Sequence, residues 1–447
     1  MGGAPQAPTW ELFLCPNVPA PAAGDGSDFS HPDNAPLTNL PHPMSQPELK
    51  PPTRVEDDKS MERMLDVLQD EKVIAVDTEA DGFHSYREQV CLVQVTGAGE
   101  DFIVDPFADF DMGGLGDVLA DPKRIKLFHD SEFDILILKR DYGFDFANLF
   151  DTRVAAAVLG SKAPGLASVL LDHFDVELDK SMQRSDWSRR PLTDQQVAYA
   201  RLDTHYLVDL YYEQHAALAK EDLMMVLDTE CRRLEKTIPP PHVFRPGDFA
   251  KVKGGKDLRP MARTILRELF ILRDALAKEK NVPPFRILGN HVLLALAEER
   301  PRSVQSLGNV KGCSSLVRGR YGNDIIDVIE DALDMDPIEQ WPRAPRKANA
   351  EDFTEEEQEL NDRLKTVRKK ACDRHDIEAA YLMHRSALAN IARALPRNLD
   401  QLEEASGFEP WQTDWFGDDL LDCVEKFEAD LKAGTALKKG SKRWNRS

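Results

Sequence analysis

The chain has 447 residues, of which 42% are apolar, 30% are charged and 8% are aromatic. This composition is typical of folded globular protein, and the length suits two to four domains of about 100–200 residues each. The formal charge of −21 argues against a general affinity for nucleic-acid backbones, although a local basic path stays compatible with it. No apolar run reaches the ~20 residues of a membrane-spanning helix, so no membrane partner is expected.

The first part of the chain lacks the pattern of a folded domain. Residues 1–55 are rich in Pro, Gly, Ala and Ser, and we expect them to be disordered. They lack the basic and continuously apolar regions of a secretory signal, which makes the cytoplasm the expected location. The six cysteines are widely spaced and form no CxxC pair, so reduced thiols are expected rather than a zinc site or a disulfide framework.

Residues 56–225 alternate strand and helix signals and predict an α/β domain around one sheet. The apolar runs predicted as strands are 73–79 (VIAVDTE), 90–95 (VCLVQV), 102–106 (FIVDP) and 125–130 (IKLFHD). A helix is expected at 133–143. A long helical stretch is expected at 192–220, where Thr193 is a candidate N-cap and Gln196 would complete a capping box.

The remaining chain is predicted to be helical. Residues 226–256 include TIPPPHVFRPGDFAKVKGG, whose four prolines and three glycines predict a linker. Residues 272–307 align without gaps with residues 367–402, so we infer a duplicated helical domain. Two copies are too few for a solenoid. The predicted boundaries of this part are 257–340 for the first helical domain, 351–431 for the second, and 432–447 for a basic tail that either contacts a nucleic-acid backbone or is simply solvated.

Carboxylates follow the first predicted strand. Asp77 and Glu79 lie two residues apart and therefore share one face of that strand. Carboxylates that converge without a Lys or Arg repel one another, and a hard divalent cation is the natural partner. A solvated turn is the plainer alternative. Asp130, Glu132 and Asp134 surround the start of the next helix, where first-turn capping alone would also account for them.

A third acidic stretch, AYARLDTHYL, places Tyr199 and Asp203 four residues apart on one helical face. Taken alone, this spacing is also typical of an amphipathic helix with a buried Tyr. Taken together, the three stretches favour two-metal phosphodiester cleavage, in which paired ions bind the scissile phosphate, activate a water and stabilise the leaving oxygen. A neutral Tyr hydroxyl can orient the attacking water.

These residues also resemble a known family. DTE at 77–79, HDSEFD at 129–134 and YARLD at 199–203 resemble the three motifs of the DEDD exonuclease superfamily, which is RNase H-like in fold. Tyr199, four residues before the last Asp of the third motif, resembles the tyrosine of the DEDDy branch. Ala198 stands where the DEDDh branch has a His. With the stretch LDKSMQRSDWSRRPL and two repeats similar to HRDC domains, the chain resembles ribonuclease D and its exosome-associated relatives.

The resemblance implies a fold and a site. The fold would be an α/β RNase H-like exonuclease domain, a mixed sheet with flanking helices, followed by two all-α HRDC-like domains. Tyr199 would orient the attacking water. The implied ligands of two divalent metal ions, Mg²⁺ or Mn²⁺, are Asp77, Glu79, Asp134 and Asp203. Asp81, Asp130 and Glu132 are not ligand positions of the family, His129 is expected to be packed or hydrogen-bonded, and Ala80 replaces the bulky aromatic residue that often follows the first motif.

The segment KSMQRSDWSRRPL places cations beside a tryptophan just before the third motif. Cations contact phosphates and an indole can stack on a base, which is how single-stranded nucleic acid is bound without sequence preference. A surface loop with the indole packed onto the domain is the alternative. The candidate substrate contacts are Lys180, Arg184, Trp187 and Arg190.

We therefore predict a metal-dependent 3′–5′ exoribonuclease that trims the 3′ ends of structured RNA such as tRNA precursors and releases 5′-mononucleotides. Its partner would be RNA with a free 3′ end, and no obligate protein partner is implied. The alternatives are a DEDDy DNA 3′–5′ exonuclease and a non-catalytic RNA-binding scaffold. The paired HRDC-like domains favour RNA, and the filled motif positions argue against the scaffold.

Overall fold

The computed structural model describes residues 49–241, 243–342 and 353–436. The basic residues of the predicted tail from Lys438 onward, and most of the N-terminal segment, lie outside these ranges. The end of that segment is described, and here the expected disorder is wrong. Residues Thr53–Val55 form strand β1, which pairs in parallel with β4 (Glu100–Val104), because Val55 is fully buried in the domain core.

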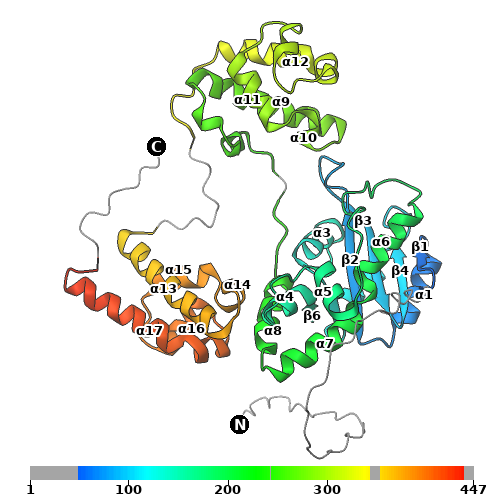
Figure 1. Cartoon of the computed structure of the whole chain (residues 1–447), viewed down its shortest axis with the longest axis vertical. Coiled ribbons are helices and arrows are strands. Elements are labelled where there is room, and N and C mark those ends of the chain that lie inside the picture. Colours follow the sequence, from blue (N-terminus) through cyan, green and yellow to red (C-terminus); the bar gives the residue numbers. More distant parts are fainter. Residues whose placement is uncertain (1–48, 242, 343–352, 437–447) are drawn as a thin grey trace, which may run out of the picture. The chain divides into compact units, whose positions relative to one another are not determined.

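A mixed sheet forms the centre of the N-terminal domain. In the described part of the chain it has six strands in the order β1-β4-β3-β2-β5-β6 (Figure 1). The other strands are β2 (Val73–Ala80), β3 (Val90–Gly97), β5 (Ile125–Phe128) and β6 (Leu149–Asp151). β2 pairs antiparallel with β3 and parallel with β5, so the strand that precedes the first acidic motif is central. Its first four residues are buried, as expected for an apolar run in the middle of a sheet.

Helices flank this sheet, as Figure 1 shows. They are α1 (Asp58–Leu68), α2 (Gly113–Ala120), α3 (Glu132–Tyr142), α4 (Thr152–Val158), α5 (Leu166–Phe174), α6 (Asp194–His205), α7 (Leu207–Lys220) and α8 (Met224–Glu235). The capping box of Thr193 and Gln196 is confirmed at the start of α6. The long helical stretch expected at 192–220 is helical but divided in two, because Tyr206, with a ψ of −3°, ends α6 and begins α7.

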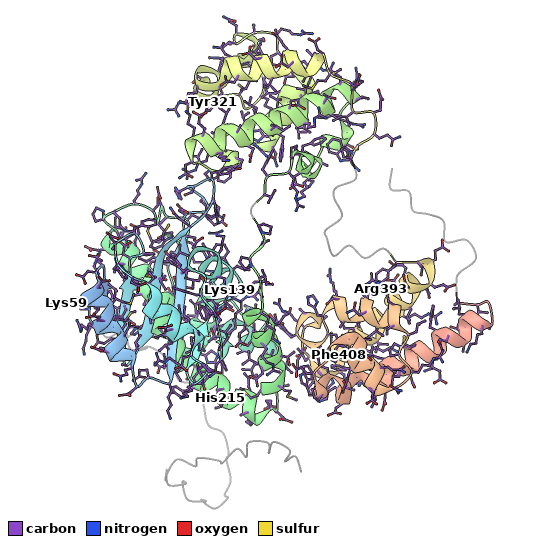
Figure 2. All side chains as sticks on the ribbon, turned by 180° about the vertical axis from the view of Figure 1, so that it is seen from behind. Lys59, Lys139, His215, Tyr321, Arg393 and Phe408 are labelled. Carbon is purple, nitrogen blue, oxygen red and sulfur yellow. The ribbon has the colours of Figure 1, made fainter. Side chains whose placement is uncertain are left out.

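The segment expected as a linker is partly structured. Helix α8 extends to Glu235, and its C-terminal end is tied to α3 because Lys139 Nζ donates to the carbonyls of Glu235 and Thr237 at 2.5 and 3.1 Å (Figure 2). A 3₁₀ helix, Pro246–Lys251, then buries Phe249 in the core of the first helical domain. Apolar side chains on both sides of the proline-rich stretch explain why the irregular part is shorter than its composition suggests.

The two helical domains repeat one plan, which confirms the inferred duplication. The first has α9 (Pro260–Lys280), α10 (Pro284–Ile287), α11 (Asn290–Glu299) and α12 (Ser315–Leu333). The second has α13 (Glu355–His375), α14 (Ala379–Leu382), α15 (Arg385–Ala394), α16 (Leu399–Ser406) and α17 (Pro410–Lys432). The first three helices of each have 21, 4 and 10 residues.

Equivalent arginine side chains make the same contact within each of the two helical domains. Arg273 Nη1 donates to the carbonyl of Leu288 at 3.2 Å, and the aligned Arg368 Nη1 donates to the carbonyl of Met383 at the same distance. Tyr321 on α12 lies in the apolar core of the first domain (Figure 2). Of the helices in the described ranges, none is both long and apolar enough to cross a membrane.

Candidate active site

The first acidic motif lies at the end of the central strand. Asp77 and Glu79 pair in register with Gln94 and Leu92 of β3, and the register shifts immediately after Glu79. A shift of this kind bends the strand and redirects the side chains that follow it, which is common beside active sites. The hydroxyl of Thr78 donates a hydrogen bond to Asp134, so the second motif is tied directly to the first.

The second motif is positioned by a residue that the sequence reasoning missed. Asp151, at the end of β6, accepts hydrogen bonds from the Ser131 backbone N–H and hydroxyl, both at 2.8 Å, and from the Asp130 N–H at 3.1 Å. The same carboxylate caps α4 through the N–H of Arg153 at 2.9 Å. Because the turn before α3 is fixed in this way, Asp134 enters the first turn of α3 with only 6% of its surface exposed.

The other polar residues around the second motif lie away from the carboxylates. Asp130 forms an exposed ion pair with Arg153 at 3.6 Å, and Glu132 faces Arg233 at 3.8 Å. His129 Nδ1 lies 2.9 Å from the Thr152 hydroxyl, and burial lowers the pKa of His129 to about 4. The histidine is therefore a neutral, packed residue at neutral pH, as the sequence suggested.

The third motif is anchored through the opposite side of α6. Asp101 on β4 accepts hydrogen bonds from Arg201 Nε at 3.1 Å, His205 Nδ1 at 2.9 Å and the Thr96 hydroxyl at 2.9 Å. The Thr96 and Thr204 hydroxyls lie 2.8 Å apart. Although burial alone would raise it, these hydrogen bonds hold the pKa of Asp101 below its ordinary value. Residues 201, 204 and 205 thus fix the helix to the sheet, and Tyr199 and Asp203 are left to face the other motifs.

The four carboxylates form one electrostatic unit. Burial is the largest cause that raises the pKa of Asp77 well above its ordinary value, and repulsion from Asp134, Asp203 and Glu79 adds to it. The same two causes raise the pKa of Glu79 to about 9 and that of Asp203 to about 7. Burial also raises the pKa of Asp134 to about 7, against the opposing effect of the Thr78 hydrogen bond. The carboxylates of the three motifs therefore lie near enough to raise one another's pKa.

The chemistry of this set fits divalent cations. Its donors are hard oxygen ligands, and their charges repel one another with no Lys or Arg among the groups that shift their pKa values. Within residues 49–241, 243–342 and 353–436, no three His, Cys, Asp or Glu side chains are close enough to hold an ion as they stand.

Tyr199 and Trp187 pack together beside the carboxylates. Their ring centroids lie 6.0 Å apart, and Trp187 is fully buried. Burial and the charge of Asp203 raise the pKa of the Tyr199 hydroxyl, so this hydroxyl stays protonated across the physiological range. Of the two alternatives for Trp187, the structure contradicts stacking on a base and supports an indole packed onto the domain, because the side chain is fully buried in an apolar cluster.

The cations of the same segment divide into two kinds. Arg190 is held by Asp105, with Nη2 at 2.7 Å from Oδ1, and its Nη2 also donates to the Cys91 carbonyl at 2.7 Å. These contacts use Arg190 to fasten the segment to β3 and the end of β4, which makes it a poor phosphate ligand. Lys180 and Arg184 are exposed, and the Arg184 guanidinium lies over the ring of Phe83 at 5.8 Å.

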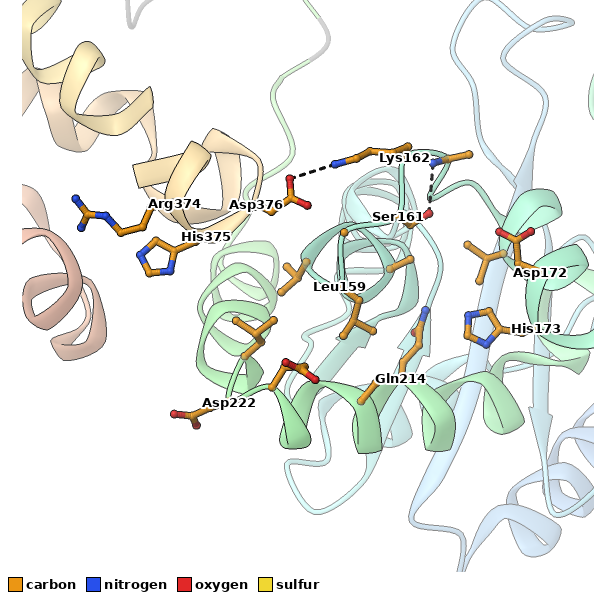
Figure 3. A pocket seen from close by; sticks show the side chains of 18 of the residues that line it. Leu159, Ser161, Lys162, Asp172, His173, Gln214, Asp222, Arg374, His375 and Asp376 are labelled. Atoms are coloured by element: carbon orange, nitrogen blue, oxygen red, sulfur yellow. Dashed lines mark hydrogen bonds and ion pairs between the residues drawn. The ribbon is translucent and has the colours of Figure 1, made fainter. Parts of the chain in front are cut away.

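Two pockets involve residues of the catalytic domain. One, of about 240 Å³, lies against α6 and is lined by residues that include Leu178, Met182, Tyr199 and Asp203, so it opens beside the catalytic candidates. Figure 3 draws another pocket, to which the catalytic domain contributes residues such as Leu159, His173 and Gln214. None of the four carboxylates lines this second pocket, whereas Asp203 lines the first.

Comparisons with known proteins agree with the geometry. Residues 52–216 match the family described as 3′-5′ exonuclease, and residues 262–329 and 357–424 each match the HRDC domain. An exosome complex component 10 homolog from Caenorhabditis elegans is 36% identical over 294 residues, which cover 64% of this chain and 33% of that protein. The chain thus spans about a third of the length of this relative.

Two further relatives extend the match. A ribonuclease D from Desulfotalea psychrophila is 28% identical over 324 residues, which cover 72% of this chain and 85% of that protein. The catalytic core of RRP6 from Trypanosoma brucei superposes with a TM-score of 0.59 and 29% identity over 63% of this chain and 80% of that chain. The exonuclease family is metal-dependent, in agreement with the carboxylate set. Residues 52–216 therefore belong to the 3′-5′ exonuclease family and are followed by two HRDC domains, and the chain as a whole is similar to ribonuclease D.

Proposed function

We propose that this protein hydrolyses RNA from a free 3′ end and releases 5′-mononucleotides, with structured precursors such as tRNA precursors as substrates. The observation that carries the proposal is the convergence of Asp77, Glu79, Asp134 and Asp203, from three separate elements, beside the neutral hydroxyl of Tyr199. The likeness to ribonuclease D and to exosome exonucleases supports RNA as the substrate. A cytoplasmic location is also proposed, and the free cysteines of the described residues are compatible with a reducing compartment.

The chain's own residues have distinct tasks in this reaction. Asp77, Glu79, Asp134 and Asp203 would hold two divalent ions, Mg²⁺ or Mn²⁺. Bound there, such ions neutralise the scissile phosphate and lower the pKa of a bound water. Tyr199 forms a hydrogen bond with the attacking water and so sets the line along which the water approaches phosphorus. As the water oxygen bonds to phosphorus and gives up a proton, the bond from phosphorus to the 3′ oxygen breaks and that oxygen takes up a proton from solvent. The phosphate stays on the 5′ oxygen of the released nucleotide.

A degradation assay tests this proposal. Matched RNA and DNA oligonucleotides with free or blocked 3′ ends are incubated with Mg²⁺ or Mn²⁺, or with EDTA, and the products are resolved by length. We expect stepwise shortening of RNA from the free 3′ end, no shortening in EDTA, and loss of at least about 100-fold in kcat for Asp77→Asn. Activity in EDTA, or full activity in Asp77→Asn, contradicts the mechanism. Faster loss of DNA contradicts only the substrate.

A second variant separates chemistry from binding. Tyr199→Phe keeps the ring that packs on Trp187 and removes only the hydroxyl. We expect kcat to fall at least about 10-fold while the Kd for RNA changes less than about twofold, because the hydroxyl acts on the water and not on the strand. An unchanged kcat would remove the tyrosine from the mechanism. Tyr212→Phe, which alters an exposed tyrosine of α7, is the control.

A further inference from the structure

The loop that follows the first motif presents an aromatic ring to solvent. Phe83 lies four residues after Glu79, and 51% of its surface is exposed. Four residues of extended chain span at most about 14 Å, so the backbone of Phe83 lies within that distance of the backbone of Glu79. A phenylalanine this exposed leaves apolar surface in water, and in a loop beside an active site such surface is a candidate ligand contact.

The loop is held in shape by a buried carboxylate. Asp81 is 1% exposed and accepts hydrogen bonds from the Ser85 hydroxyl, from the Gln89 N–H at 2.9 Å and from Gln89 Nε2 at 3.2 Å. The N–H groups of His84 and Ser85 donate to the Asp81 carbonyl at 2.7 and 2.9 Å. The ring of Phe83 is therefore carried on a fixed turn, and little conformational entropy is lost when a ligand stacks on it.

A cation from the third-motif segment completes the arrangement. The Arg184 guanidinium lies 5.8 Å from the centre of the Phe83 ring, within the range of a cation–π contact. His84 joins the two loops, because its Nδ1 lies 3.4 Å from Asp186 and its Nε2 lies 3.3 Å from the Arg184 carbonyl. Among the described residues no carboxylate forms an ion pair with Arg184, in contrast to Arg190, which Asp105 neutralises.

We propose that Phe83 and Arg184 form a platform that binds one nucleotide near the 3′ end of the RNA, with the base stacked on Phe83 and a phosphate paired with Arg184. A flat apolar face beside an unneutralised cation matches the two parts of a nucleotide, and stacking accepts every base. This proposal rests on the proposed function, since Phe83 follows the first exonuclease motif along the chain. Asp81 acts here as a positioning residue.

Binding and kinetics test the platform. The Kd of a labelled single-stranded RNA is measured by fluorescence anisotropy in the Asp77→Asn background, and KM and kcat are measured in the otherwise unaltered chain. Phe83→Ala is expected to raise Kd and KM by about tenfold and to change kcat less than about twofold, whereas Phe83→Trp retains binding. The control is Tyr212→Ala, which removes an exposed ring from α7. Unchanged Kd and KM in Phe83→Ala overturn the platform.

Salt dependence tests the phosphate contact. Arg184→Gln is expected to lower the slope of log Kd against log salt concentration by about 0.7, the value for one phosphate of a single strand. Lys59→Gln, which alters an exposed cation on α1 (Figure 2), should leave the slope unchanged. Equal slopes for the wild-type chain and Arg184→Gln would remove the arginine from the platform.

Abasic substrates locate the stacked base. Single abasic sites are placed at successive positions from the 3′ end, and each substrate is tested against the wild-type chain and Phe83→Ala. At one position the loss of the base and the loss of the ring should be non-additive, because each removes the same contact. Full additivity at every position overturns the stacking. If the chain binds RNA with this pattern but does not shorten it, the proposed function fails while the platform stands.

Discussion

Burial disfavours the charged form of each of the four site carboxylates, and for Glu79 this has a measurable effect on the stability of the protein. Its pKa rises from an ordinary 4.5 to about 9, because of burial first and the charges of Asp203 and Asp134 second. The folded chain therefore keeps a proton that the unfolded chain releases. Stability from this group is complete below pH 4.5 and is lost progressively as the pH rises through 9.

We expect the melting temperature of the metal-free protein to decrease as the pH is raised from 6 to 9, because this range lies above the ordinary pKa of Glu79 and reaches its raised pKa. Glu79→Gln should weaken this dependence, because the amide has no proton to lose. Divalent metal should also flatten it by neutralising the carboxylates. Differential scanning fluorimetry across this pH range makes the measurement. A wild-type slope that neither change alters would contradict the shared electrostatics.

Among the elements, α6 depends on a buried ion pair for its position. Arg201 is 8% exposed and Asp101 is 7% exposed, and together with His205 they fasten the helix to the sheet. Removing one partner leaves a buried charge without compensation, which costs about 3–5 kcal/mol. We expect Arg201→Ala to lower the free energy of unfolding by this amount, and to lower kcat more than it raises KM, because Tyr199 and Asp203 lose their alignment.

A double-mutant cycle checks this assignment by chemical denaturation. Arg201→Gln with Asp101→Asn should lose less stability than the sum of the two single changes, since neither charge then remains unpaired. Strict additivity would mean that the two side chains stabilise the fold independently. The motif YARLD thus serves two faces of one helix: Tyr199 and Asp203 face the carboxylates, and Arg201 faces β4.

On the scale of the whole molecule, the repeated helical domains allow a test of independence from the catalytic domain. Arg273 is 8% exposed and donates to the carbonyl of Leu288 and, at 2.7 Å, to Asn290 Oδ1. Arg273→Ala should lower the melting temperature of the first helical domain and leave kcat on a short RNA within about twofold. Calorimetry resolves the transitions. A large loss of kcat would show instead that this domain acts in the chemistry. Arg368→Ala makes the matched change in the second repeat.

The sequence by itself determined the parts whose cause is local. The apolar run at 73–79 predicts a strand, Thr193 and Gln196 predict a helix start, and the repeat in the helical region predicts two like domains; all three are confirmed. The spacing of Asp77 and Glu79, and of Tyr199 and Asp203, also fixes which side chains share a face, since that depends only on the period of a strand or a helix. The division at Tyr206 and the strand at Thr53–Val55 were missed, because packing against distant elements decides them.

Only the tertiary structure decided which polar residues build the site and which surround it. Asp151 and Asp101 lie far along the chain from the motifs they hold, and nothing in their neighbouring residues signals that role. The sequence alone does not distinguish Trp187 and Arg190 from Arg184 as candidate substrate contacts. In the folded chain Trp187 is buried and Asp105 neutralises Arg190, so neither is free to bind substrate. A side chain's use depends on what encloses it and which charges it meets, and these are properties of the folded chain rather than of the segment that carries it.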